Sequence, residues 1–493
     1  MNFWPLNPLI YEINTWVWLN DLSMQEGRIV TLGNVPEKVW DEIAAFRFDA
    51  IWLMGVWQRS PLSIAISNRH PGNLSDFYRA LPDFTPEDNV GSPYSVRGYV
   101  VDEHLGGTHG LAVARKELQK RGIRLILDFV PNHLAHDHRW VTEHPDYFIQ
   151  GDHEDLIKDP FSFVKYGDDI FACGKDPFYP AWQDVLQLNT FNPGLREQIR
   201  QTVLDIATQC DGVRCDMAML VMNDIVEKSW GEKAGPRLPA EYWTELIRRV
   251  KDKHPDFLFI AEAYWDLEWE LIQQGFDFCY DKRLYDLFEK ADVQQKSQYL
   301  SADASYQSKM LRFIENHDEP RAISVFQEDK GKAAALAMAT LPGARLFHEG
   351  QMEGRTIKLP VFLRRRSKEL LNGGLRTFYE KLLNIVSGEV FHSDTWRKCE
   401  CSGWPDNPEY KNLLAWLWKG RNEYFLAAIN FCGNETHGKV CLGLEEMEGQ
   451  QWQLDDLLSG ERYERDGNEL TSSGLYVGLP PWGFHFFRIT LMI

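Results

Sequence analysis

Two charged residues, Arg214 and Asp216, stand two positions apart inside the otherwise apolar stretch GVRCDMAML at 212–220. Charged side chains are rare in buried segments unless they are paired or take part in chemistry. Because strand side chains alternate between two faces, both residues would lie on one face. There the guanidinium would keep the carboxylate ionised and oriented at neutral pH. Taken alone, the two residues could equally form a structural ion pair.

Acidic side chains also stand at the ends of three further apolar runs that are typical of buried strands. The runs cover 123–130, 257–264 and 309–317, and their acidic residues are Asp128, Glu262 and Asp318. Together with Asp216, these residues form a set of carboxyl groups that each follow a buried strand. In a (β/α)8 barrel the carboxyl ends of all strands meet at one face, and TIM-barrel enzymes build their active sites there.

The elements between these strands favour such a barrel. Amphipathic helices are indicated before the strands, for example LAVARKELQKRG at 111–122 and EYWTELIRRVKDKH at 241–254. Near-continuous apolar strands that alternate with helices imply a parallel sheet covered on both faces. The spacing of the strand ends fits units of about 30 residues, with 50–57 and 275–282 as further strands. We therefore predict an α/β chain whose main domain is a TIM barrel.

Two segments fall outside the barrel pattern. Asp128 and Asp216 lie too far apart for one β/α unit, and the excess around 134–190 is rich in His, Asp, Pro and aromatic residues. After Gly388, short apolar runs separated by turn residues replace the helical pattern, which is typical of an antiparallel all-β domain. The predicted organisation is a barrel over 1–133 and 191–388, a small inserted domain after strand 3 over 134–190, and a C-terminal antiparallel β-sandwich over 389–493.

Composition and charge restrict the class of protein. A formal net charge of −19 argues against nucleic acid or an anionic membrane as the main partner. No window approaches about 18 consecutive apolar residues, so we expect no membrane span. The N-terminus lacks a basic segment followed by an uninterrupted apolar stretch, so we expect no signal peptide. The eight cysteines are spread along the chain, which favours free thiols and a cytoplasmic location.

Four of the strand-end motifs resemble, in order and spacing, the signature regions of the α-amylase family, glycoside hydrolase family 13. These motifs are DFVPNH (128–133), GVRCDMAML (212–220), AEAYW (261–265) and FIENHDEPR (313–321). YSVRGY (94–99) and WQDVLQLNTFNP (182–193) look like two further regions of that family. The resemblance extends over essentially the whole chain, because a barrel, an inserted domain and a C-terminal β-domain are the family's architecture.

The resemblance implies roles for three carboxylates that chemistry on an acetal also requires. Asp216 matches the family's nucleophile, Glu262 its general acid/base, and Asp318 the carboxylate that grips the sugar hydroxyls. Cleavage with net retention needs a nucleophilic carboxylate and a carboxylic acid about 5–5.5 Å apart. Glu262 lies among apolar and aromatic neighbours, whose desolvating effect should raise its pKa, as an acid requires.

The same resemblance assigns sugar contacts to further residues. His133 and His317 match histidines that bond the sugar at the cleaved position, and Tyr94 matches a stacking tyrosine. Asp128 matches a structural carboxylate at the end of strand three. Trp265 is a further aromatic residue that we expect beside the sugar, because aromatic faces suit sugar rings.

A structural calcium ion is a further expectation, although the chemistry itself requires no cofactor. Asn132 and Asp184 match positions that often hold calcium in relatives. Calcium usually takes about 6–8 oxygen ligands, and these two residues are the ones that the motifs identify.

The chain departs from the family pattern just after Asp216. Many α-amylases carry a Lys-His pair three and four residues after the nucleophile, where it contacts the sugar beyond the cleaved bond. Here those positions are Met219 and Leu220. If their apolar side chains line the acceptor side, they offer no hydrogen bonds to a glucose ring, so we expect poor cleavage of long starch.

These residues predict a retaining α-glycoside hydrolase that acts on α-glucosides or short α-glucans through a covalent glycosyl-enzyme intermediate. The expected partner is a carbohydrate substrate. An α-glucosyl transferase or a phosphorylase of the same family is the alternative, because both would use the same intermediate and the same carboxylates. A catalytically inactive sugar-binding protein is less favoured, because all three carboxylates are present.

Overall fold

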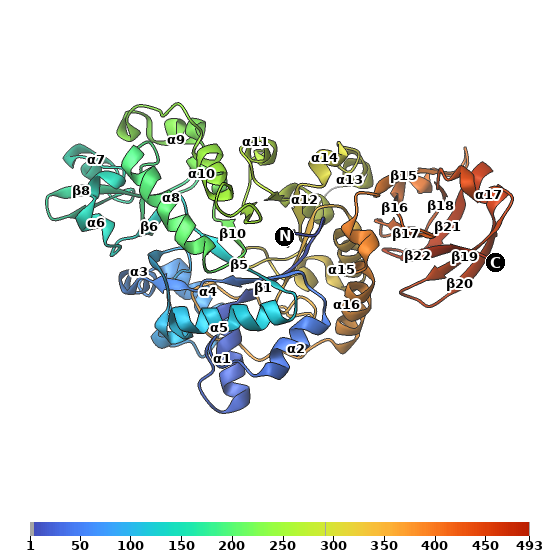
Figure 1. Cartoon of the computed structure of the whole chain (residues 1–493), viewed down its shortest axis with the longest axis horizontal. Coiled ribbons are helices and arrows are strands. Elements are labelled where there is room, and N and C mark those ends of the chain that lie inside the picture. The colour runs from blue at the N-terminus through green and yellow to red at the C-terminus, as the bar shows by residue number, and fades with distance from the viewer. Residues whose placement is uncertain (1–3, 291, 493) are drawn as a thin grey trace.

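The computed structural model describes residues 4–290 and 292–492, and its centre is a closed barrel of eight parallel strands (Figure 1). The barrel strands are β1 (Leu9–Asn14), β2 (Ala50–Met54), β5 (Arg124–Phe129), β10 (Gly212–Cys215), β11 (Leu258–Ala261), β12 (Phe278–Tyr280), β13 (Met310–Arg312) and β14 (Ala344–His348). The barrel closes because β1 pairs with both β2 and β14. The predicted TIM barrel is confirmed.

The two helices predicted at 111–122 and 241–254 each bury one stripe, as the sequence pattern predicts. In α10 (Tyr242–Lys251), the buried side chains follow a helical period and the basic residues gather in the last turn, where they complement the helix dipole. The other longer helices of the barrel are α1 (Thr15–Glu26), α2 (Glu37–Ala45), α5 (Gly107–Lys120), α8 (Pro193–Ala207), α12 (Lys282–Lys290), α15 (Ala322–Thr340) and α16 (Gly373–Val386).

Short elements connect these units and cover the ends of the barrel. The short helices are α3 (Pro61–Ser67), α4 (Pro71–Ala80), α9 (Asn223–Trp230), α11 (Glu268–Gln273), α13 (Val293–Tyr299) and α14 (Ala304–Gln307). Strands β3 (Trp57–Arg59) and β4 (Val96–Val101) form a small antiparallel pair after β2. The sequence analysis did not identify β1 or β14, and β1 proves important because it carries Glu12.

A small antiparallel sheet is inserted between the third and fourth barrel strands. It consists of β6 (His133–Ala135), β7 (Phe163–Tyr166), β8 (Asp169–Gly174) and β9 (Trp182–Gln187) in the order β6-β9-β8-β7. The same segment contains α6 (Trp140–Glu143) and α7 (His153–Lys158). The hydroxyls of Ser63 and Ser95 both donate to the carbonyl of Asp184, which ties β9 to the barrel loops.

The C-terminal strands form one continuous antiparallel sheet that folds around its own core. The strands are β15 (Arg397–Ser402), β16 (Leu413–Lys419), β17 (Glu423–Asn430), β18 (Thr436–Cys441), β19 (Gln451–Asp456), β20 (Arg462–Asp466), β21 (Leu475–Leu479) and β22 (Phe484–Leu491). A short helix, α17 (Gly467–Ser472), joins β20 and β21. The two layers are continuous rather than separate, because β15 pairs with β16 through its first half and with β18 through its second. Leu426 of β17 and Val477 of β21 share the enclosed core.

The sequence also led us to expect no membrane span and free cysteine thiols. Within 4–290 and 292–492, every helix is too short or too polar to cross a membrane. All eight cysteines are free thiols, and five of them are buried.

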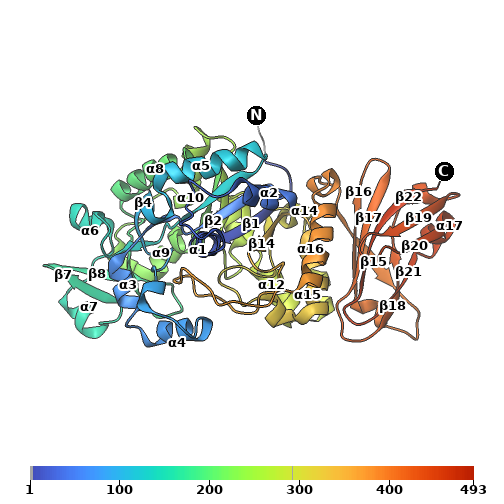
Figure 2. The same ribbon diagram turned by 90° about the horizontal axis from the view of Figure 1, so that it is seen from below.

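A tryptophan pair joins the C-terminal sheet to the barrel. Figures 1 and 2 both place α15 and α16 between the barrel and the C-terminal strands. At the end of α15, the hydroxyl of Thr340 accepts a hydrogen bond from Trp416 at 3.0 Å, and its carbonyl accepts one from Trp418 at 2.7 Å. All three residues are fully buried, so neither indole can exchange its partner for water.

Thr340→Val should therefore lower the stability of the barrel–sheet contact. Valine keeps the shape of threonine but leaves the Trp416 indole N–H without its acceptor, which costs about 1–3 kcal/mol when buried. Denaturant and thermal unfolding measure the loss. The matched control is Thr377→Val on α16, because Thr377 is exposed and its hydroxyl bonds the carbonyl one turn back. Equal unfolding midpoints for the two variants would contradict the prediction.

Candidate active site

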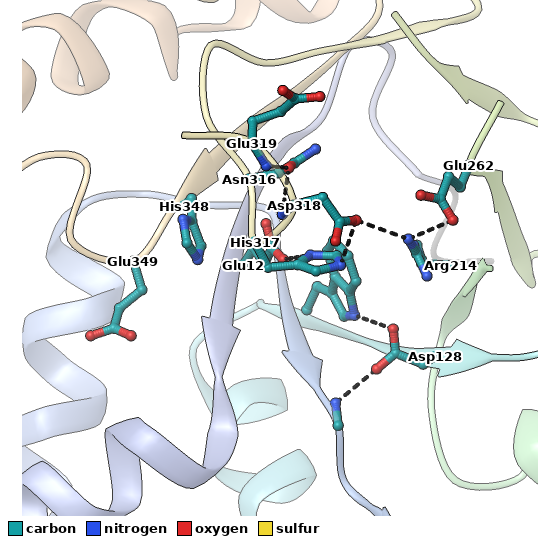
Figure 3. Close-up of polar contacts among 12 residues, drawn as sticks. Glu12, Asp128, Arg214, Glu262, Asn316, His317, Asp318, Glu319, His348 and Glu349 are labelled. Carbon is teal, nitrogen blue, oxygen red and sulfur yellow. Dashed lines mark hydrogen bonds and ion pairs between the residues drawn. The ribbon is translucent and has the colours of Figure 1, made fainter. Parts of the chain in front are cut away.

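Arg214 lies at the carboxyl end of the barrel, and its guanidinium lies beside all three predicted carboxylates. Figure 3 shows its contacts with Glu262 and Asp318. Arg214 Nη1 donates to Asp216 Oδ1 at 2.6 Å. Its Nη2 lies 2.8 Å from Glu262 Oε2 and 3.9 Å from Asp318 Oδ2. The arginine side chain is only 1% exposed, so its charge is balanced by these carboxylates rather than by water.

Aromatic rings enclose the same guanidinium. The rings of Trp52, Tyr94 and Tyr280 have their centroids 5.4, 5.0 and 5.6 Å from its central carbon. The Tyr280 hydroxyl also accepts a hydrogen bond from Arg214 Nε at 3.3 Å. Burial opposes the charge, but the surrounding carboxylates, Glu262 foremost, hold the pKa of Arg214 well above its usual value. The arginine is therefore a fixed cation.

Glu262 follows β11 and is the carboxyl group most ready to carry a proton. Its Oε2 accepts a hydrogen bond from the Met217 backbone at 2.6 Å, and its Oε1 accepts one from the Tyr264 hydroxyl at 2.9 Å. Burial raises the pKa of Glu262 to about 7, against the opposing charge of Arg214. Near neutral pH this carboxyl group can therefore both give and take a proton.

Asp216 follows β10 and is held between backbone and guanidinium. Its backbone N–H donates to the Phe129 carbonyl at 2.8 Å. Burial raises the pKa of Asp216 above its usual value, and the charge of Arg214 and the hydrogen bond to it offset part of that rise. Of the two buried carboxyl groups, Asp216 has the direct guanidinium hydrogen bond that favours the ionised form.

Asp318 differs from both, because its side chain is 42% exposed. Its Oδ2 lies 2.9 Å from His317 Nε2, and its backbone carbonyl accepts a hydrogen bond from Lys358. Burial would raise its pKa, but the charge of His317 and, to a smaller degree, that of Arg214 hold the pKa well below its usual range. Asp318 is thus an ionised carboxylate that a ligand in solution can reach.

His317 connects Asp318 to a buried acid that the sequence analysis missed. Its Nδ1 pairs with Oε1 of Glu12 on β1, and its Nε2 lies 2.6 Å from the Tyr94 hydroxyl. Glu12 is 0% exposed. The signal was present in the sequence, because Glu12 interrupts the apolar run LIYEIN just as Arg214 interrupts its own run.

Asp128 links β5 to the loop that follows β2. Its two oxygens accept hydrogen bonds from the Trp52 indole at 3.1 Å and from the Gly55 backbone at 2.8 Å. Burial raises its pKa to about 6. These contacts orient Trp52, whose ring packs against both Arg214 and His317.

The structure places His133 and Trp265 on different elements around these carboxylates. His133 begins β6, and burial lowers its pKa to about 3, so its imidazole is neutral. Trp265 has a left-handed backbone (φ 65°), and its ring centroid lies 4.9 Å from that of Phe178. Trp265, Met217 and Tyr264 line a pocket of about 740 Å³ next to Glu262.

The prediction that Met219 and Leu220 line the acceptor side is wrong. Their exposed fractions are 0% and 4%, and Met219 belongs to the hydrophobic core. The reason is the backbone at Met217 (φ 42°), which turns the chain inward into a 3₁₀ turn over Ala218–Val221. The Trp243 indole holds this turn by donating to the Ala218 carbonyl at 2.8 Å. Met217 is the residue of this segment that reaches the pocket.

Asn132 and Asp184, the two residues expected at a calcium site, have different surroundings. The amide of Asn132 pairs with that of Gln187, with the Gln187 Nε2 to Asn132 Oδ1 distance at 2.9 Å. Asp184 instead lines a separate pocket beside His70 and Trp182. Within 4–290 and 292–492, no three His, Cys, Asp or Glu side chains gather where they could hold a metal ion.

Comparison with protein-family models gives one match. The model described as "Alpha amylase, catalytic domain" matches residues 40–372, which is more than half of the chain. This segment contains β2 and the later barrel strands, the inserted sheet and the three carboxylates.

Similar proteins and structures agree with that match. Alpha-amylase MalA of Haloarcula japonica is 24% identical over 322 residues, which cover 64% of this chain and 40% of that protein. Oligo-1,6-glucosidase of Parageobacillus thermoglucosidasius is 24% identical and covers 61% of each chain. The chain thus spans less than two thirds of either relative. The maltogenic α-amylase AmyB of Thermotoga neapolitana has the same fold over 100% of both chains, with a TM-score of 0.71 and 18% identity.

Gln187→Leu tests the amide pair between Asn132 and Gln187. Leucine has a similar volume but leaves the buried Asn132 amide unpaired, which should cost about 1–3 kcal/mol and lower the melting temperature. The control is Gln183→Leu, an exposed position on the same strand. A chelator should leave the wild-type melting temperature unchanged. A drop on chelation would reveal a bound metal that this arrangement does not explain.

Proposed function

We propose that this chain, which belongs to the α-amylase family, is a retaining α-glycosidase acting on α-glucosides or short α-glucans. The observation that supports this is the shared guanidinium of Arg214, which contacts Asp216 and Glu262 at once. Two carboxyl groups on one guanidinium are close together, which favours the short separation of about 5–5.5 Å typical of retaining enzymes. The two groups also differ in surroundings: burial raises the pKa of Glu262 to about 7, as suits an acid, whereas Asp216 accepts the guanidinium hydrogen bond that favours a carboxylate nucleophile.

In the first step, an Asp216 oxygen attacks the anomeric carbon while the Glu262 proton moves to the departing glycosidic oxygen. The carbon–oxygen bond to the leaving group breaks, and the sugar becomes an ester of Asp216. In the second step, Glu262 takes a proton from water, and that water's oxygen attacks the same carbon. Asp216 leaves as a carboxylate, and both residues return to their starting state. Two inversions give net retention.

Other residues hold the sugar while these bonds change. Asp318 is ionised and exposed, so it can accept hydrogen bonds from two sugar hydroxyls. His317 and Tyr94 lie directly beside it. Neutral His133 can donate from one ring nitrogen and accept at the other. These contacts would distort and orient the ring that carries the cleaved bond.

The pocket beside Glu262 is the proposed site of the leaving group. Met217, Tyr264 and Trp265 give it an apolar and aromatic wall. Four charged residues of its rim form two ion pairs. Arg283 contacts Asp266 at 3.1 Å, and Lys282 contacts Asp286 at 2.6 Å. A leaving group that is small or partly apolar suits this wall better than a long glucan.

Asp216→Asn and Glu262→Gln should each reduce turnover by several orders of magnitude while the fold is kept. Fresh product, followed by NMR, should appear first as the α-anomer. With azide, a variant lacking the Asp216 carboxylate should give the β-glycosyl azide, because azide replaces the nucleophile. A variant lacking the Glu262 carboxyl should give the α-azide, because azide attacks the ester intermediate. Initial β-anomer, or more than a tenth of wild-type rate in Asp216→Asn, would refute these roles.

Trp265→Ala should weaken recognition of aryl α-glucosides. We expect kcat/KM to fall about tenfold, the equivalent of about 1.4 kcal/mol of lost stacking. Hydrolysis of α-glucosyl fluoride should change little, because fluoride does not fill the pocket. Trp269→Ala is the matched control, since Trp269 is exposed and lies outside the pocket lining. If the wild type degrades soluble starch as fast as its best small glucoside, the acceptor contacts come from elsewhere.

A further inference from the structure

We propose that Glu12 on the first barrel strand is a positioning residue that holds His317 as an imidazolium. His317 then acts beside Arg214 as a second fixed cation, which keeps Asp318 ionised and in place. The catalytic consequence rests on the proposed function, whereas the charge state of His317 can be tested without it.

Both ring nitrogens of His317 face a carboxylate oxygen, and Nε2 also lies 2.6 Å from the Tyr94 hydroxyl. Its Nδ1 faces Glu12 Oε1, and its Nε2 faces Asp318 Oδ2 at 2.9 Å. A neutral imidazole has one N–H donor and one lone pair, so one of these carboxylates would then meet a lone pair. The imidazolium donates from both nitrogens and is the form that fits both contacts.

The burial of Glu12 leads to the same conclusion. Its side chain is 0% exposed, and its Oε2 has no hydrogen-bond partner within the described residues. The sheet fixes it there, because Glu12 lies in register with His348 of β14 and Trp52 of β2. A carboxylate in such a place is costly unless an opposite charge lies against it, and His317 provides that charge.

The groups around His317 favour its charged form overall. Facing it are Glu12 from β1, Trp52 from β2, Tyr94 from the segment before β4, Asp128 from β5, Arg214 from β10, and Asp318 from its own loop. Burial and Arg214 oppose protonation. The carboxylates outweigh them, and Asp318 and Glu12 raise the pKa of His317 to about 10.

Glu12→Gln separates the charge of Glu12 from its shape. The glutamine carbonyl can still accept the hydrogen bond from His317, but the negative charge is gone. Because that charge stabilises the imidazolium, its removal lowers the pKa of His317, and the imidazolium is lost at lower pH. An opposite charge in direct contact shifts a pKa by about 1–3 units.

The pH profile should be measured with α-glucosyl fluoride. Fluoride leaves without a proton, so deprotonation of Glu262 near pH 7 does not hide the later loss of the His317 proton. We expect the alkaline limb of kcat/KM for Glu12→Gln to lie about 1–3 units below that of the wild type. A role of Glu12 in packing alone would lower activity or stability without moving this limb.

NMR of histidine-labelled protein reads the same charge directly. The His317 signal is assigned by its loss in His317→Asn, and in the wild type it should remain that of an imidazolium up to about pH 8. The matched control is Glu315→Gln, which removes a buried carboxylate that pairs with Arg321 and His348. This control should leave both the pH limb and the His317 signal in place.

Each outcome decides the proposal. A neutral His317 in the wild type at pH 7 overturns it, as does a Glu12→Gln variant with the wild-type pH limb and His317 signal. If Glu12→Gln does not fold, the wild-type titration alone decides. If the protein cleaves no α-glucoside, the proposed function fails, while the His317 titration still supports or overturns the role of Glu12 in setting its charge.

Discussion

The buried guanidinium of Arg214 is the constraint on which the rest of the site depends. A cation that is 1% exposed must be neutralised by carboxylates that the fold places within reach. The sheet register does this, because Arg214 pairs with Asp128 of β5 on one side and with Ile260 of β11 on the other. Asp216 and Glu262 then follow their strands at the same height. The parallel barrel therefore positions two acids from separate motifs with the accuracy of a hydrogen-bonded sheet.

The strand-end carboxylates could be predicted because each interrupts or ends a long apolar run, and burial makes such a residue conspicuous. Glu12 was missed because its strand stands before the first helix, without a neighbouring motif, and because Glu12 lies inside the strand rather than at its end. The inward turn at Met217 was missed for a different reason. A left-handed residue that is not glycine is dictated by packing, here around Trp243 and the Ala218 carbonyl, and the local sequence carries no sign of it.

The surroundings of Asn132 show what a family motif alone does not predict. Asn132 stands where the motif places it, yet its amide is fully used by Gln187. Gln187 lies on β9, far along the chain from Asn132, which follows β5. The packing of the inserted sheet brings the two residues together. A sequence motif therefore predicts which residue stands at the end of a strand. It does not predict which distant side chain that residue will contact.

The balance of charge explains how one site can hold an acid and a nucleophile together. Two cations, Arg214 and His317, face five carboxyl groups: Glu12, Asp128, Asp216, Glu262 and Asp318. The five carboxyl groups outnumber the two cations, and a proton on Glu262, whose pKa burial raises to about 7, reduces the excess of negative charge. In the proposed mechanism, positive charge develops on the sugar in the same place when the glycosidic bond breaks. That charge would meet fixed carboxylates that are already oriented, and it would replace the Glu262 proton as the compensating charge.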